Sequence, residues 1–229
     1  MPPPTTSLTK GAFDRRIFAI GDVHGCAEKL ATLLGRIPLE PERDTLIFLG
    51  DLIDRGPGSM EVIETICRLQ RQGVAVLGLI GNHEYLLREY QQSGDTALLP
   101  YLRANGIEAT LDSYGAASQR GLADLSFMPL AHREFLAALR PYWETDDFIF
   151  VHAGIMPGIP LADHDLPTLC EKRGEFLLAE VTGSKRVVFG HTPFATPFIT
   201  PTKIGIDTGA VYGNLLTAVE LPAIRFYHA

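Results

Sequence analysis

The feature that most constrains the fold of this chain is a recurring pattern in which a short apolar run ends and polar side chains that can bind a metal follow directly. Five runs of this kind are followed by the sequences GDVHG (21–25), GDLIDRG (50–56), GNHE (81–84), HAG (152–154) and GHT (190–192). The runs are too short and too continuous for amphipathic helices, so they indicate buried β-strands. Ligand sites in open α/β sheets lie beyond the carboxyl ends of the strands. We therefore expect the five strand ends to converge on one rim.

Apolar runs of strand length continue toward the end of the chain, with helix-like segments between the early ones. The strand candidates are Ile17–Ile20, Thr45–Leu49, Val74–Ile80, Phe148–Val151, Arg186–Phe189, Lys203–Ile206 and Leu215–Leu221. The helix candidates are Ala27–Arg36, Ser59–Gln72 and Glu84–Gln92. This early β-α-β alternation, followed by strand-rich sequence, predicts an α/β fold with buried sheets.

The length of 229 residues fits one domain. Residues 1–12 form a proline-rich, polar lead that we expect to be flexible, and residues 13–229 are expected to form the single domain. Within that domain, residues 93–142 are mostly helical in character and contain no candidate ligand. We interpret this segment as an insertion or cap that shapes the substrate entrance, with plain helical packing as the alternative.

Composition and charge restrict the class of partner. The formal net charge of −7 argues against broad attraction to nucleic acid or to an anionic membrane surface. It leaves a small phosphorylated substrate open, because bound metal ions reverse the local charge. The three cysteines (Cys26, Cys67, Cys170) are widely spaced and none begins a C-x5-R sequence, so neither a disulfide framework nor a cysteine-nucleophile phosphatase is predicted. No signal-peptide core or bilayer-length apolar run is present, and we expect a cytoplasmic protein.

The strand ends supply two aspartates, one asparagine and three histidines as candidate metal ligands: Asp22, His24, Asp51, Asn82, His152 and His191. Each alone has an ordinary interpretation, since an Asp after a Gly is commonly a turn residue and a lone His is commonly a hydrogen-bonded polar residue. Four of the seven histidines fall in these motifs, however, and the other three, His132, His164 and His228, are expected on the surface or in loops. Oxygen and imidazole donors without a thiolate suit Mn²⁺, Fe or Zn²⁺. Two metals need a shared anionic bridge, for which Asp51 is the natural choice.

Taken together, G-D-x-H-G, G-D-x-x-D-R-G, G-N-H-E, a later His after an apolar strand and G-H-T resemble the phosphoprotein phosphatase branch of the calcineurin-like metallophosphoesterases. The likeness is greatest to the compact bacterial and bacteriophage members of the serine/threonine phosphatase type. The motifs occur in order from Gly21 to Thr192, and Ile206–Val211 extends the likeness. The resemblance implies a central β-sandwich of two mixed sheets flanked by helices, with a dinuclear metal site at the carboxyl ends of the strands.

The resemblance also implies a role for each candidate residue. The first metal takes Asp22, His24 and Asp51, and the second takes Asp51, Asn82, His152 and His191. His83 is then the acid that protonates the leaving oxygen, oriented by Asp54, and Arg55 holds phosphate oxygens. Arg173 matches a second phosphate clamp, although the Trp that precedes it in many relatives is absent; a solvated helix charge is the alternative. Two divalent ions are implied, with Mn²⁺ as the first choice and Fe or Zn²⁺ as alternatives.

These features predict a metal-dependent phosphomonoester hydrolase in which a metal-bridging hydroxide attacks phosphorus in line. The first hypothesis is a serine/threonine protein phosphatase acting on a phosphorylated protein or peptide. The alternative is a hydrolase of diadenosine polyphosphates or other small nucleotides, which uses the same motifs. A nuclease does not suit the acidic chain, and a non-catalytic binding module does not suit a complete ligand set. The eukaryotic C-terminal motif is replaced by Asp207–Val211, so no eukaryotic-type regulatory subunit is expected.

Overall fold

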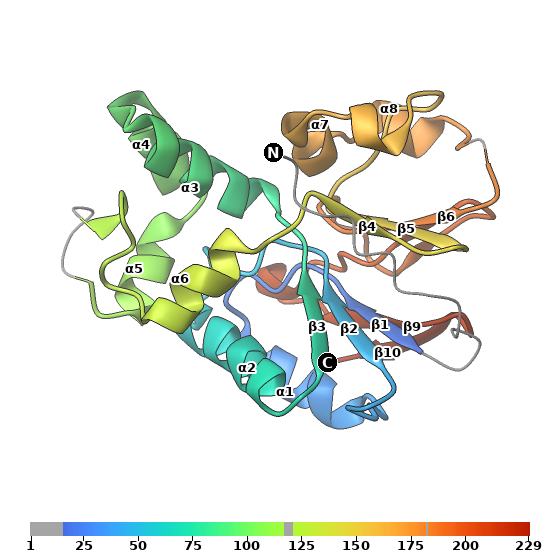
Figure 1. Ribbon diagram of the computed structural model, residues 1–229, viewed down its shortest axis with the longest axis horizontal. Helices are drawn as coiled ribbons and strands as arrows, with labels where there is room; N and C mark the ends of the chain where they lie inside the picture. Colours follow the sequence, from blue (N-terminus) through green and yellow to red (C-terminus); the bar gives the residue numbers. More distant parts are fainter. Residues whose placement is uncertain (1–15, 117–120, 182) are drawn as a thin grey trace.

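The computed structural model describes residues 16–116, 121–181 and 183–229. The predicted flexible lead, residues 1–12, lies outside these described residues. The described chain forms two five-stranded sheets packed face to face and flanked by helices, as Figure 1 shows. The predicted α/β class, with a sandwich of two mixed sheets, is confirmed.

The first sheet has the order β10-β9-β1-β2-β3. Its parallel strands are β1 (Ile17–Ile20), β2 (Thr45–Phe48) and β3 (Ala75–Gly78), and β9 (Thr217–Leu221) pairs antiparallel with both β1 and β10 (Arg225–His228). The second sheet has the order β4-β5-β6-β8-β7. Its parallel strands are β5 (Phe148–Val151), β6 (Arg186–Phe189) and β8 (Lys203–Gly205), with antiparallel β4 (Tyr142–Glu144) and β7 (Phe198–Ile199) at the edges.

Both faces of the central strands are buried, which explains why these strands appear as continuous apolar runs. Because successive side chains point to opposite faces, Ala19 and Ile47 pack between the sheets against Phe150 and Val188 of the second sheet. The neighbouring residues in the same strands, such as Phe18 and Phe48, point to the opposite face and belong to the core under the helices.

The helices cover the two outer faces of the sandwich (Figure 1). Beneath the first sheet in that view lie α1 (Ala27–Arg36) and α2 (Ser59–Arg71), and above the second lie the short α7 (Leu166–Glu171) and α8 (Gly174–Leu178). On one side stand α3 (Asn82–Ser93), α4 (Leu99–Ala104), α5 (Ile107–Ser113) and α6 (Leu130–Ala137). The described residues also contain three single-turn helices, at Thr96–Leu98, Leu161–Asp163 and Ala210–Tyr212.

The start of α3 differs from the sequence prediction in a way that bears on the site. The predicted helix begins at Glu84, whereas α3 begins at Asn82, so Asn82 and His83 lie in its first turn. The Glu84 carboxylate accepts the backbone N–H of Gly81 at 3.0 Å and thereby caps the helix. Helical geometry therefore fixes the direction in which Asn82 and His83 point.

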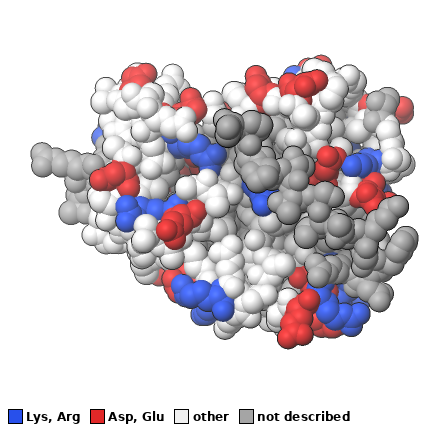
Figure 2. Space-filling model, viewed as in Figure 1, with Lys and Arg blue, Asp and Glu red and all other residues white. Residues whose placement is uncertain are grey.

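Among the described residues, no helix combines the length and the apolar character that a bilayer crossing requires. Figure 2 shows acidic and basic side chains interspersed over the visible face of the molecule.

Candidate metal centre

The strand ends converge because the strands that carry them run parallel within each sheet. The loop after β1 is held to the loop after β2 by hydrogen bonds from the backbone N–H groups of Val23 and His24 to the carbonyl oxygen of Asp51, at 3.0 and 2.8 Å. In the second sheet, the N–H of Gly190 donates to the carbonyl oxygen of His152 at 2.8 Å. Backbone contacts thus set the positions of the polar side chains before any metal binds.

The loops follow an unusual backbone path at the site. Five non-glycine residues adopt positive φ angles there: His24 (44°), Asp51 (49°), Asp54 (71°), Arg55 (68°) and His191 (62°). Such conformations cost L-residues of the order of 1–3 kcal/mol each and persist where the surroundings impose them. Their concentration at the strand ends is typical of a functional site.

Two glycines allow the backbone to approach the candidate carboxylate ligands closely. A Cβ atom at Gly81 would lie 2.2 Å from Oδ1 of Asp51, and one at Gly190 would lie 2.1 Å from Oδ1 of Asp22. No side chain fits at either position without displacing the carboxylate. These glycines of the GNHE and GHT motifs therefore serve the site directly.

Asp51 lies between two groups of side chains. Its Oδ2 atom is 3.3 Å from Nε2 of His24, and its Oδ1 atom is 3.5 Å from Nε2 of His152. Two clusters with geometry suitable for a metal share this carboxylate: one adds His24 and His83, and the other adds His152 and His191. Asp51 therefore occupies the position that a bridging ligand requires. The first cluster contains His83, for which the family resemblance implies the role of an acid and not of a ligand.

Backbone carbonyl groups orient two of the imidazole rings. Nδ1 of His24 lies 3.0 Å from the carbonyl oxygen of Ile53, and Nδ1 of His152 lies 2.8 Å from that of Leu49. A carbonyl can only accept, so each Nδ1 donates, and the lone pair of a neutral ring then lies on Nε2, on the side of Asp51. This arrangement prepares an imidazole for metal binding.

The remaining candidates complete the second cluster. Oδ1 of Asn82 is 3.2 Å from Nε2 of His152 and 2.8 Å from Nδ1 of His191. On the other side of its ring, His191 accepts a hydrogen bond from Nε of Arg173 at 2.7 Å. Arg173 therefore reaches the site instead of extending away into solvent.

Buried carboxyl groups are concentrated in the centre. Asp22, Asp51 and Asp207 are all buried, and both oxygens of Asp22 accept the backbone N–H of His191 at 3.0 Å. Burial, together with the charges of Asp207 and Asp51, raises the pKa of Asp22 well above its usual value. Burial and the neighbouring His152 lower the pKa of His191 to about 3, so this ring is neutral. Buried carboxylates beside neutral imidazoles fit divalent cations, and the donor set without thiolate suits Mn²⁺, Fe or Zn²⁺.

His83 and Asp54 form a buried pair next to this centre. Nδ1 of His83 is 2.8 Å from Oδ2 of Asp54, whereas Nε2 of His83 is buried without a hydrogen-bond partner. Burial opposes the charged ring, but the carboxylates of Asp51 and Asp54 outweigh it and raise the pKa of His83. The pair can therefore keep a proton on His83, with Nε2 open toward a reacting group.

Arg55 bridges the first cluster and the rim of the site. Its Nη1 atom lies 2.9 Å from Nε2 of His24 and 2.8 Å from the hydroxyl oxygen of Tyr212. The guanidinium carbon also lies 5.7 Å from the centre of the Tyr212 ring, within the range of a cation–π contact. Cationic side chains thus touch both clusters, Arg55 at His24 and Arg173 at His191.

Sequence reasoning missed several side chains that contact the site, among them Glu84, Thr110 and Tyr212. Glu84 lies beneath it, Thr110 lies on Asp54, and Tyr212 lies on Arg55. Glu84 carries a recognisable signal, since a Glu at the third position of a helix is half of a capping box. Thr110 and Tyr212 carry none, because they are 56 and 157 residues away from their partners.

The prediction for His132 is wrong. This ring is buried and not on the surface, with Nδ1 2.8 Å from the hydroxyl of Tyr114 and Nε2 2.8 Å from a carboxylate oxygen of Glu64. Its position on the inner face of α6, against α2, could not be read from the residue type alone.

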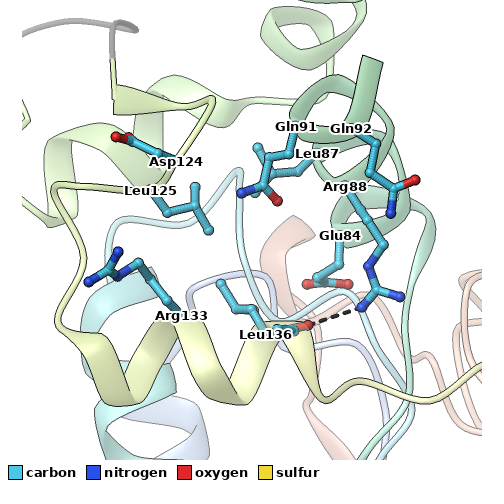
Figure 3. Close-up of a pocket in the computed structure, with 10 residues that line it drawn as sticks. Glu84, Leu87, Arg88, Gln91, Gln92, Asp124, Leu125, Arg133 and Leu136 are labelled. Carbon is cyan, nitrogen blue, oxygen red and sulfur yellow. Dashed lines mark hydrogen bonds between the residues drawn. The ribbon is translucent and has the colours of Figure 1, made fainter. Parts of the chain in front are cut away.

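A separate cavity of about 470 Å³ lies between α3, the 124–125 turn and α6 (Figure 3). None of the predicted metal ligands lines it. Arg88 reaches from α3 to α6, where it donates to the carbonyl oxygen of Leu136 at 3.1 Å, and Glu84 is also among the lining residues. Glu84 therefore separates this cavity from the backbone of the metal-site loops.

Comparison with known proteins places the site in a family context. Residues 15–212 match the calcineurin-like phosphoesterase family. The asymmetrical bis(5'-nucleosyl)-tetraphosphatase PrpE of Bacillus velezensis is 30% identical, over 89% of this chain and 88% of that protein. The protein of the same name from Geobacillus sp. (strain WCH70) is 31% identical over 92% of each chain.

Solved structures support the fold. One, assigned provisionally as a diadenosine tetraphosphatase, superposes with a TM-score of 0.71 at 22% identity and covers 95% of this chain and 94% of that chain. A cold-active protein-tyrosine phosphatase of a Shewanella species superposes with a TM-score of 0.66 at 16% identity, covering 93% of this chain and 78% of that chain. At these identities the likeness speaks for the fold alone.

Proposed function

Because the chain belongs to the calcineurin-like phosphoesterase family, we propose that it hydrolyses bis(5'-nucleosyl) polyphosphates, cleaving a tetraphosphate asymmetrically into a nucleoside triphosphate and a nucleoside monophosphate. The observation that carries this proposal is the match to PrpE-type proteins at about 30% identity over nearly the whole of both chains. A match of this extent includes residues 93–142, the segment expected to shape the substrate entrance.

The comparisons favour the dinucleoside polyphosphate, which is the alternative substrate in the sequence analysis, over the phosphorylated protein, which is the first hypothesis there. A serine/threonine protein phosphatase was the first hypothesis, and no comparison confirms it. The dinucleotide hydrolase was the alternative, and the named relatives favour it. A phosphorylated peptide remains the second candidate substrate.

We assign the metal centre to the six side chains found at the strand ends: Asp22, His24, Asp51, Asn82, His152 and His191. Two divalent ions held there, with Mn²⁺ as the first choice, would neutralise phosphoryl charge and lower the pKa of a water molecule enough to supply a nucleophile near neutral pH. Asp51 would serve as the shared ligand, since its two oxygens face His24 and His152.

The protein's own groups position the substrate and move the proton. Arg55 and Arg173 offer planar guanidinium groups beside the two clusters, and each can bind two phosphate oxygens at once. His83 gives the proton on Nε2 to the oxygen that leaves phosphorus, while Asp54 holds Nδ1. The phosphorus–oxygen bond to the leaving group breaks as the oxygen of a deprotonated water bonds to phosphorus, and the proton which that water released to solvent replaces the one that His83 gave up.

Tyr212 supplies a surface suited to a nucleoside. Its side chain is 66% exposed although it contacts Arg55, so one face of an aromatic ring stands open beside a proposed phosphate clamp. Aromatic side chains bind nucleobases by stacking without regard to base identity. A phosphoserine or phosphothreonine side chain carries no planar ring, so this exposed ring favours the dinucleotide.

The test is a hydrolysis assay on metal-stripped protein with Mn²⁺ added back. Diadenosine tetraphosphate, a phosphothreonine peptide and p-nitrophenyl phosphate are compared as substrates, and Asp51→Asn serves as the metal-deficient control. We expect the highest kcat/KM on the dinucleotide, with ATP and AMP as products. ADP as the sole product, or a preference for the peptide, would overturn the proposal.

A further inference from the structure

We propose that Thr110, on α5 within residues 93–142, positions the proton donor of the active site by fixing the Asp54 carboxylate. The inference rests on one part of the proposed function, the role of His83 as the acid. It does not depend on which phosphate ester is the natural substrate. It assigns a role to a segment in which the sequence showed no candidate ligand.

The Thr110 hydroxyl makes two hydrogen bonds to one residue. It donates to Oδ1 of Asp54 at 2.7 Å, and it accepts from the backbone N–H of Asp54 at 2.9 Å. A carboxylate can only accept, so the single hydroxyl proton of Thr110 is committed to Oδ1. Both side chains are fully buried, so water does not compete for either contact.

Ser59, at the start of α2, completes the arrangement. Its hydroxyl oxygen is 3.1 Å from that of Thr110, and it accepts from the N–H of Asp54 at 3.2 Å. Because Thr110 has already used its proton, Ser59 donates to Thr110. The direction of every hydrogen bond in this buried set is therefore determined by the carboxylate.

The consequence reaches the acid through the second oxygen of the carboxylate. With Oδ1 held by Thr110, Oδ2 faces Nδ1 of His83 at 2.8 Å, and Nε2 of His83 is left to face the reacting group. Asp54 has a φ of 71°, a backbone conformation that L-residues adopt only where the surroundings impose it. Without the Thr110 hydroxyl the carboxylate is free to rotate about χ2 and the imidazole loses its fixed direction.

A second contact ties the same segment to the phosphate clamp. The N–H of Arg55, the residue after Asp54, donates to the carbonyl oxygen of Gly106 at 3.2 Å. A Cβ atom at Gly106, whose φ is 90°, would lie 3.0 Å from that nitrogen. Residues 106–110 therefore hold both Asp54 and Arg55 in place. Through Asp54, this part of the 93–142 segment also contacts the proposed acid His83.

A purely structural role for Thr110 makes a different prediction. If Thr110 only packs α5 against α2, its loss lowers turnover of every substrate by the same factor. If it positions the acid, the loss depends on how much the leaving group needs a proton. Phenyl phosphate has a poor leaving group, whereas p-nitrophenyl phosphate releases a stabilised anion that hardly needs protonation.

The experiment replaces Thr110 by Val, which has nearly the same shape without the hydroxyl, and by Ser, which keeps it. For Thr110→Val we expect kcat on phenyl phosphate to fall roughly 10- to 100-fold, a part of the 10²–10⁴-fold effect of general acid catalysis. We expect kcat on p-nitrophenyl phosphate to fall less than about threefold, and KM and metal content to be unchanged, because the backbone hydrogen bond from Arg55 to Gly106 and the six candidate ligands remain. Thr110→Ser should restore both rates.

A measurement independent of activity accompanies the kinetics. In protein loaded with Zn²⁺, which is diamagnetic, the proton on Nδ1 of His83 is expected as a downfield NMR signal in the wild type, assigned by its loss in His83→Asn. In Thr110→Val this signal should shift and exchange faster with water. Thr110→Ala repeats the test should the Val variant fail to fold. Equal losses on both phosphates, or an unchanged NMR signal, would overturn the inference.

Discussion

Glu84→Gln tests whether a buried carboxylate supports the metal-site loops from beneath. Oε1 of Glu84 accepts the backbone N–H groups of Leu52 and Ile53 at 2.8 and 3.3 Å. Oε2 accepts those of Asp51 and Gly81, both at 3.0 Å. One side chain thus satisfies four donors on two loops, while only 4% of its surface is exposed.

The geometry sets the magnitude. Glutamine has one acceptor oxygen, so it can retain one pair of donors and must turn its NH₂ group toward the other pair. Leaving a buried donor unsatisfied costs about 1–3 kcal/mol, or about 2–6 kcal/mol for two. Burial and the nearby charge of Asp51 raise the pKa of Glu84, so removing its charge offsets part of this loss. We expect the free energy of unfolding to fall by about 2–4 kcal/mol.

Urea denaturation of metal-stripped protein measures this loss, with Glu89→Gln on the same helix as the matched control. Binding of Mn²⁺ should also weaken by about 10-fold, because the backbone of Asp51 loses its support. An unchanged unfolding midpoint for Glu84→Gln, or an equal shift in the Glu89 variant, would refute the reasoning.

Three further outcomes are expected. His83→Asn should lower turnover by roughly 10²–10⁴-fold while two metals per chain remain bound, and loss of metal would show that His83 is a ligand. Tyr212→Leu should raise KM for diadenosine tetraphosphate about 10-fold, as expected from a lost stacking contact worth ~1–3 kcal/mol, and leave KM for p-nitrophenyl phosphate nearly unchanged; an equal rise for both substrates would rule out a nucleobase contact. Metal-free protein should lose stability as the pH falls. The pKa of His191 is about 3 in the folded protein and 6.5 when unfolded, so the unfolded chain takes up a proton that the folded protein does not. The stabilisation is complete above about pH 6.5, and the loss between pH 7 and pH 5 should be about 2 kcal/mol. Urea unfolding of wild type and His191→Gln at both pH values isolates this contribution, and identical pH slopes would contradict it.

The central strands could be predicted from the sequence because each is buried on both faces. The bounds of β1, β5 and β6 agree with the expected ranges, because a short, mostly apolar run indicates where a buried strand begins and ends. The edge strands β4, β7 and β10 were not predicted. They have two to four residues each and are partly exposed, so no run of apolar side chains marks them.

The side chains gathered at the metal centre were predictable because parallel strands bring their carboxyl ends to one place. The structure places Asp51 between His24 and His152, as a bridging role requires. The supporting contacts were not predictable, since Thr110 and Tyr212 reach the site through the path of loops far away in the sequence. Residue type and spacing in the sequence do not indicate such long-range contacts.

The measurement that bears most directly on the metal centre is anomalous X-ray diffraction from crystals grown with Mn²⁺. Two anomalous peaks are expected, one beside His24 and Asp22 and the other beside Asn82, His152 and His191, with a carboxylate oxygen of Asp51 within bonding distance of both. A single peak, or two peaks that do not share Asp51, would contradict a dinuclear centre bridged by this residue.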